Sequence, residues 1–144
     1  MKLHEQDVLR QVSLVLAPFI VVFGLYVITH GEVGPGGGFQ GGVIIAAAYI
    51  LYALVFGQAQ AREVVSRRLT DTGAAVGVAL YAGVGVIPLL RGGEFLAYDW
   101  LDPSFAGVGH SGGAQAWGMT LVELGVGLTV ASVMVTIFSE IAEE

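Results

Sequence analysis

Glu123 is the acidic residue best placed to take part in chemistry, because it lies well inside an apolar stretch, residues 114–138. In a helix that begins at Ala114, Glu123 would lie about 14 Å along the axis, near the middle of a membrane. A charge there costs at least about 2.5 kcal/mol, so the side chain is expected to face protein or water. An ionised Glu123 could relay a proton or meet a cation, whereas a protonated one would hydrogen-bond a neighbouring helix. Thr120, one turn away, adds a hydroxyl group to the same face.

His30 is a second candidate, because it precedes a glycine-rich segment, residues 30–42, in which seven of the thirteen residues are glycine. Histidine titrates near neutral pH, so His30 could pass or sense protons. The alternative is a structural histidine that hydrogen-bonds the last carbonyl groups of a helix. Glu123, His30 and Thr120 are therefore the candidates for an ion path.

The glycine-rich segment supports two hypotheses. It could form a tight hairpin in which two helices, or a partner subunit, approach at backbone distance. It could instead be a non-helical stretch whose amide and carbonyl groups line an ion path. Residues 36–41 match the pattern G-x-G-x-x-G, but no strand precedes them, so nucleotide binding is not indicated. The predicted turn comprises Gly31, Pro35, Gly36, Gly37, Gly38, Phe39, Gln40, Gly41 and Gly42.

Long charge-free runs must position these residues, since residues 11–31 and 33–61 contain no Asp, Glu, Lys or Arg. Four segments approach the length of about 20 residues that crosses about 30 Å of hydrocarbon. We therefore expect an all-α integral membrane protein, with residues 1–144 forming a single domain and a glycine-rich hairpin between the first two helices. The expected helices are Val12–Thr29, Phe39–Phe56, Thr72–Leu90 and Ala114–Phe138.

The composition excludes several classes of protein. Only 12% of the residues are charged, against about 25% in soluble domains. There is no cysteine, and the net charge of −6 argues against a nucleic-acid binder. No pair of histidines has the spacing of metal ligands, so a bound metal is not expected. No Ser/His/Asp set is present, so we expect no catalytic residues and no cofactor.

Lysine and arginine predict the orientation. Four crossings place both termini and the second loop on one side, which then carries all of the basic residues except Arg91. Basic residues stay cytoplasmic, so both termini are expected inside the cell. The loop of residues 91–113 would face outward, with aromatic side chains at the membrane interface. These aromatic residues are Phe95, Tyr98, Trp100 and Phe105.

Small residues recur on the third and fourth expected helices, where they allow close helix contacts. Lipid-facing helices do not need so many small residues, and four short helices cannot supply every partner. We therefore expect a subunit of a larger membrane assembly. The predicted packing positions are Gly73, Gly77, Gly118, Gly125 and Gly127.

The runs Tyr26–Gly31 and Pro35–Gly42 resemble the signature of the MnhB family, the B subunits of Mrp-type multisubunit cation/proton antiporters. The stretch from Trp117 to Val130 is similar to the last helix of that family. The resemblance implies a small accessory subunit, beside other subunits and lipid, in a prokaryotic cell-membrane complex that exchanges Na⁺ for H⁺. It carries Glu123 and His30 over only as candidates.

Two alternatives stay open at this point. The same family supplies subunits to the ion-translocating arm of complex-I-like membrane-bound hydrogenases and sulfur-reductase complexes. The chain could also be a purely structural subunit that helps the complex to assemble.

Overall fold

The structure is a computed structural model that describes residues 3–31, 36–90, 92–96, 98 and 113–142. Pro35, Arg91, Trp100 and Phe105 of the sequence analysis lie outside the described residues. The described helices are α1 (Leu3–Thr29), α2 (Gly38–Phe56), α3 (Gln58–Val64), α4 (Arg67–Leu90) and α5 (Gly113–Ala142). All except α3 are long and apolar enough to cross a membrane, which confirms the expected all-α fold with four spans.

The helices extend beyond the spans expected from hydropathy. α1 begins at Leu3 instead of Val12, and α4 begins at Arg67 instead of Thr72. α5 continues past Phe138 to Ala142. Charged residues are excluded from hydrocarbon but not from helices, because Lys, Arg and Glu are good helix formers. The charge-free runs therefore mark the membrane crossing, and the helices continue into the interface on either side.

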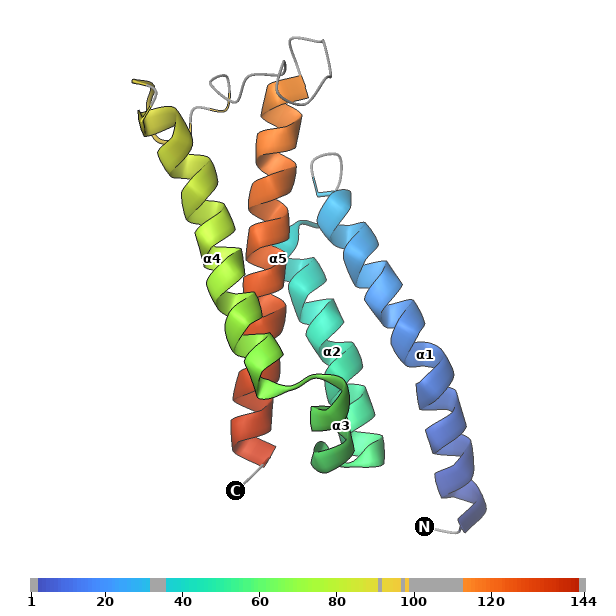
Figure 1. Cartoon of the computed structure of the whole chain (residues 1–144). Coiled ribbons are helices and arrows are strands. Elements are labelled where there is room, and N and C mark those ends of the chain that lie inside the picture. The colour runs from blue at the N-terminus through green and yellow to red at the C-terminus, as the bar shows by residue number, and fades with distance from the viewer. Residues whose placement is uncertain (1–2, 32–35, 91, 97, 99–112, 143–144) are drawn as a thin grey trace.

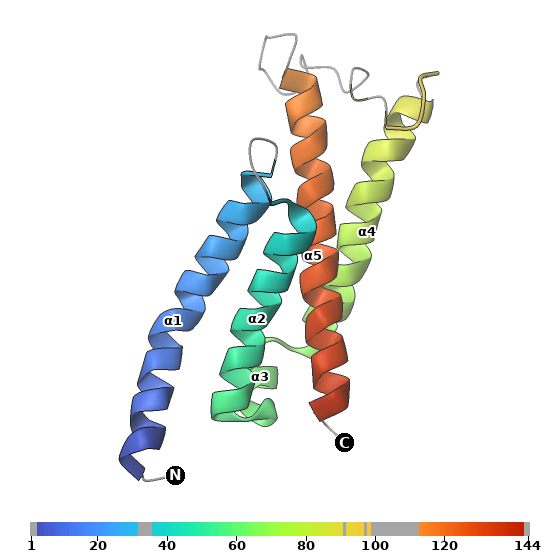
Figure 2. The ribbon, with the colours of Figure 1, turned by 180° about the vertical axis from the view of Figure 1, so that it is seen from behind.

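The four long helices lie in a row in the order α1, α2, α5, α4 and do not form a closed bundle (Figure 1). The reverse view shows the same order (Figure 2). α1 packs mainly on α2 and also touches α5, while α4 packs on α5. The start of α1 and the end of α5 lie at the same end of the molecule, as an even number of crossings requires (Figure 1).

The buried core lies where α3 packs against α2 and α5. Ala61 of α3 is completely buried and packs with Ala46, Tyr49 and Ala53 of α2 and with Val135 of α5. Sequence reasoning did not predict α3, whose seven residues are too few to show a clear helical period. The chain enters it through Gly57, whose φ of 94° is a conformation that glycine adopts readily.

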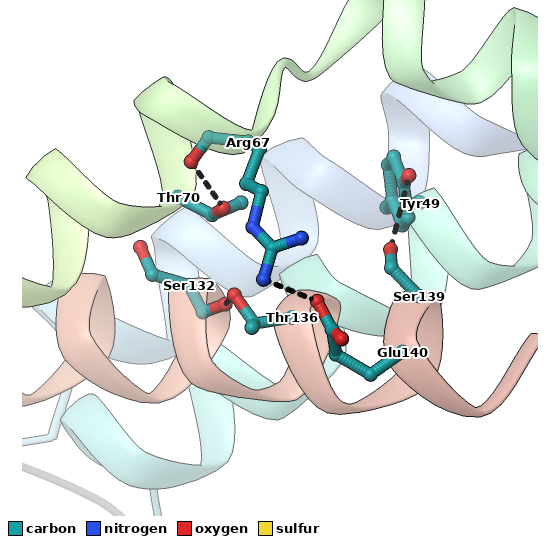
Figure 3. A network of polar contacts seen from close by, with 7 residues as sticks. All are labelled: Tyr49, Arg67, Thr70, Ser132, Thr136, Ser139 and Glu140. Carbon is teal, nitrogen blue, oxygen red and sulfur yellow. Dashed lines mark hydrogen bonds and ion pairs between the residues drawn. The ribbon is translucent and has the colours of Figure 1, made fainter. Parts of the chain in front are cut away.

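Polar contacts join the first turn of α4 to the last turns of α5 (Figure 3). The guanidinium group of Arg67 lies 2.7 Å from the carboxylate of Glu140, and both side chains are about half exposed. An exposed pair of this kind contributes at most about 1 kcal/mol. Deeper in the molecule, the hydroxyl groups of Tyr49 and Ser139 lie 3.4 Å apart and link α2 to α5.

Candidate functional site at the glycine-rich turn

The side chain of Glu123 lies against the turn between α1 and α2. A Cβ atom added to Gly31 would lie 2.8 Å from the Cδ atom of Glu123 and still closer to Oε1. A Cβ atom added to Gly37 would lie 3.5 Å from the same Oε1. The other carboxylate oxygen, Oε2, is buried. The structure thus brings together two features that the sequence left separate, the acidic residue of α5 and the glycine-rich turn.

Backbone hydrogen bonds hold the two ends of the turn together. The amide of His30 donates to the carbonyl of Tyr26 at 3.0 Å, which continues the hydrogen bonding of α1 by one residue. The amide of Gly37 donates to the carbonyl of Val27 at 3.3 Å, so the start of α2 is attached to the last turn of α1. Gly37 has a φ of 115°, which side chains rarely allow. Glycine at this position therefore lets α2 begin directly beside α1.

Glycines also bring α2 into backbone contact with α5. A Cβ atom added to Gly38 would collide with the backbone carbonyl of Glu123 and would lie 3.0 Å from the amide nitrogen of Gly127. One turn later, a Cβ atom on Gly42 would lie 2.6 Å from the carbonyl oxygen of Gly127. Contact at this distance fixes the level of Glu123 relative to the turn.

Glu123 lies about one third of the way along α5. It is about 15 Å along the axis from Gly113 and about 29 Å from Ala142. The first turn of α2 begins at this depth, because Gly38 contacts the backbone of Glu123. The start of α2 is therefore recessed by about three helical turns from the start of α5.

The position of the carboxylate is electrostatically favourable. The N-cap residue of α2 is Gly37, which has no side chain to accept hydrogen bonds, and the first turn of α2 contains no acidic residue. The amide groups at a helix N-terminus carry a partial positive charge that favours a nearby anion. Glu123 supplies a carboxylate at that end of α2 from a different helix.

The other two ion-path candidates occupy different positions. The ring of His30 is exposed and stacks on Tyr26, with ring centroids 5.0 Å apart, and Tyr26 in turn stacks on Phe23. These contacts place the His30 ring on the outer surface of α1. Thr120 lies one turn from Glu123 on α5, and its hydroxyl group donates to the carbonyl of Ala116 at 2.9 Å.

The small residues of α4 and α5 lie against each other. A Cβ atom added to Gly77 would lie 2.6 Å from the carbonyl oxygen of Gly125, and a Cβ atom on Gly73 would collide with the hydroxyl group of Ser132. Gly118 is buried. Gly73, Gly77 and Gly125 are thus covered by helices of the same chain, so they do not by themselves require the helices of another subunit.

Three further residues of the turn, Phe39, Gln40 and Gly41, differ in burial. Phe39 and Gln40 are exposed, whereas Gly41 packs on α1, where an added Cβ atom would lie 2.6 Å from the carbonyl oxygen of Gly24. Across the part of the chain that the structure describes, no three His, Asp or Glu side chains are grouped as a metal site would require.

Residues 8–136 match a protein family described as "Domain related to MnhB subunit of Na+/H+ antiporter". The match includes Glu123 and the whole glycine-rich turn. The chain belongs to the MnhB family. Its relatives include proteins named antiporter subunit mnhB2. The one from Staphylococcus epidermidis strain RP62A is 33% identical over 97% of both chains. Those from Staphylococcus haemolyticus and Staphylococcus aureus strain Newman are 35% and 34% identical over 94% of both chains. In this MnhB-family chain, the glycine-rich turn and Glu123 form the candidate site.

Proposed function

We propose that this chain is a small accessory subunit of a multisubunit antiporter that exchanges Na⁺ for H⁺ across a prokaryotic cell membrane. The family match and the four membrane-spanning helices support this function. They also favour a transporter over an enzyme. The distribution of Lys and Arg supports an orientation with both termini in the cytoplasm.

Within this function, we propose that Glu123 acts beside the route of the transported ion. The contact of its carboxylate with Gly31 and Gly37 carries the proposal. Among the acidic residues described in the spans, Glu123 lies farthest from the end of its helix. The glycines of the adjacent turn carry no side chains, so their peptide groups can lie directly against the carboxylate. An intramembrane carboxylate beside a non-helical glycine-rich backbone is a typical position for ion or proton handling.

A structural tie is the second candidate role for Glu123. The backbone contacts of Gly38 and Gly42 with α5 favour it, because they show that this region is also a tight packing point. In that role the carboxylate would hold the turn of α1 and α2 against α5 and would take no part in transport.

Substitution of Glu123 separates the two roles. Glu123→Gln keeps the size and the hydrogen-bonding capacity of the side chain but cannot change its charge. We expect the Gln form to assemble and yet to transport poorly, in Na⁺/H⁺ exchange by membrane vesicles normalised to intact complex. Glu123→Ala should also weaken assembly, by about 1–3 kcal/mol, because it leaves the partner of the carboxylate unsatisfied.

Glu140→Gln is the matched control, because Glu140 lies at the other end of α5 in an exposed pair with Arg67. It should exchange ions like the wild type. Wild-type exchange by the Glu123→Gln form at every pH would leave only the structural role. Mass identification of the purified complex tests the subunit assignment, and hydrogenase or sulfur-reductase subunits would move the chain to a redox-driven complex.

A further inference from the structure

The side chain of Ile28 fills a notch between two glycines, Gly41 of α2 and Gly127 of α5. Ile28 is 3% exposed, although most of the described side chains of α1 are exposed. A Cβ atom added to Gly127 would lie 2.6 Å from the Cδ1 atom of Ile28, and a Cβ atom added to Gly41 would collide with its Cγ1 atom. The isoleucine is therefore held directly against the backbones of α2 and α5.

The notch lies one helical turn from Glu123, on the termini side, the end of the molecule where α1 starts and α5 ends (Figure 1). Gly127 follows Glu123 by one turn of α5, which runs toward that end. α1 runs the other way, and Ile28 comes three residues before Gly31, where an added Cβ atom would touch the carboxylate. Both helices thus place the notch about 5 Å from Glu123 toward the termini side.

An apolar groove of about 420 Å³, to which all five helices contribute, follows beyond the notch. The lining residues nearest to the notch are Val21 of α1, Ile45 of α2 and Leu128 of α5. Water enters an apolar space only where polar groups offer it hydrogen bonds. The groove therefore offers a hydrated ion little that would replace its water between the termini side and the notch.

The surroundings are polar on the other side of the notch. There the carboxylate of Glu123 lies against the non-helical backbone of Gly31 and Gly37. α1 and α2 converge toward this turn and diverge toward the termini side in both views (Figures 1 and 2). Ile28 is thus an apolar constriction at the narrow end of the α1–α2 pair, and such constrictions exclude water and ions.

We infer that Ile28 is a hydrophobic seal, which leaves Glu123 accessible through this chain only from the side of the glycine-rich turn. The inference deepens the proposed function and rests on it for its meaning in transport. An ion or proton that reaches Glu123 from the turn side leaves by the same side or through a neighbouring subunit. This chain then supplies one half of a transmembrane route, and the half on the termini side belongs to another subunit.

Single cysteines test the seal, because the chain contains no cysteine of its own. Glu123→Cys in the assembled complex would be treated with a membrane-impermeant thiol reagent, in vesicles of both orientations, and its labelling measured by mass spectrometry. We expect it to react several-fold faster from the turn side than from the termini side. Trp117→Cys and Glu140→Cys, at exposed positions near the two ends of α5, calibrate access from each side. Equal reaction from both sides, reaction mainly from the termini side, or reaction from neither side would overturn the inference.

Substitution of Ile28 shows whether its side chain causes the difference. In the Glu123→Cys form, Ile28→Ser replaces three carbon atoms by a hydroxyl group that binds water, so reaction from the termini side should become several-fold faster. Ile28→Val stays apolar and should keep the difference. Val22→Ser, at a position of α1 that is 64% exposed, should also keep it. An unchanged difference in the Ile28→Ser form would leave Ile28 a packing residue and overturn the seal.

Thr120→Cys is a second reporter, because Thr120 lies one turn from Glu123 on the side away from the notch. It should show the same preference for the turn side, and reaction from both sides would again overturn the inference. Both reporters carry the test even if Ile28→Ser prevents assembly.

Ion exchange by the Glu123→Gln form is a separate measurement. Wild-type exchange together with one-sided thiol reaction would end the transport role of Glu123 and leave the seal. Reduced exchange together with two-sided reaction would keep the transport role and overturn the seal.

Discussion

The carboxylate of Glu123 occupies the space that a side chain on residue 31 would need, so Gly31 and Glu123 are sterically matched across 92 positions of sequence. Gly31 and Glu123 thus connect the turn between α1 and α2 to α5, the fourth membrane-spanning helix. Paired substitutions at the two positions can therefore test the contact.

Gly31→Ala should destabilise the complex by about 1–3 kcal/mol, as is typical of overpacking. The added methyl group would collide with the carboxylate of Glu123 and would also lie 2.7 Å from the backbone Cα atom of Gly37. Glu123→Asp shortens the opposing side chain by one methylene group, so the double variant should recover part of the loss. The thermal midpoint of the purified complex measures both effects. A double variant no more stable than Gly31→Ala alone would show that the contact with Glu123 does not limit residue 31.

Gly37→Val should prevent assembly and leave ion preference unaltered in any complex that forms. A β-branched residue at the φ of 115° costs at least about 1–2 kcal/mol. Gly83→Val is the control, because an added Cβ atom there meets no atom within 4 Å. The yield of intact complex and its selectivity among monovalent cations are the measurements. Normal assembly with altered selectivity would instead favour a turn that lines the ion path.

Gly77→Ala should weaken the packing of α4 on α5 by about 1–3 kcal/mol. The added Cβ atom would lie 2.6 Å from the carbonyl oxygen of Gly125, which is backbone and therefore has little freedom to move. Gly83→Ala, on the same helix, should be neutral or stabilising, because alanine favours helix over glycine by about 1 kcal/mol. Thermal unfolding of the complex compares the two, and equal midpoints would rule out a tight contact at Gly77.

Reporter fusions at the two termini should be active on the same side of the membrane, because the start of α1 and the end of α5 lie at one end of the molecule. We expect a fusion after Glu144 to be active in the cytoplasm, since five of the six basic residues lie on that side. Activity only outside the cell would reverse the orientation and place the glycine-rich turn toward the cytoplasm.

Hydropathy predicts the number of spans because the thickness of hydrocarbon sets a minimum charge-free length. It does not predict the order of the helices in space, which depends on contacts such as those of Gly42 with Gly127 and of Gly77 with Gly125. The sequence analysis expected a partner subunit to cover part of the small residues on α4 and α5. The contacts between α4 and α5 cover several of these residues within the chain, and coverage of the others by a partner stays a prediction.

The contact of Glu123 with the glycine-rich turn was not predicted from the sequence either. Depth along a helix can be counted in residues, but the relative level of two helices is set by their packing. One signal was available: a run of glycines leaves space that a long side chain elsewhere in the chain must fill. Nothing in the sequence pointed to the apolar groove of about 420 Å³ to which all five helices contribute, because its lining comes from five separate segments.

The recessed start of α2 also has a consequence for the surrounding bilayer. α2 is about 29 Å long, close to the hydrocarbon thickness of an average membrane, whereas α5 is about 45 Å long. The two helices end at the same end of the molecule, so the step between them lies at the other face (Figure 1). Hydrophobic mismatch costs fractions of a kcal/mol per Å. α1 and α4, at the two ends of the row, have candidate spans of 24 residues each, so both flanks match a bilayer of the same thickness and the step at α2 lies within the row.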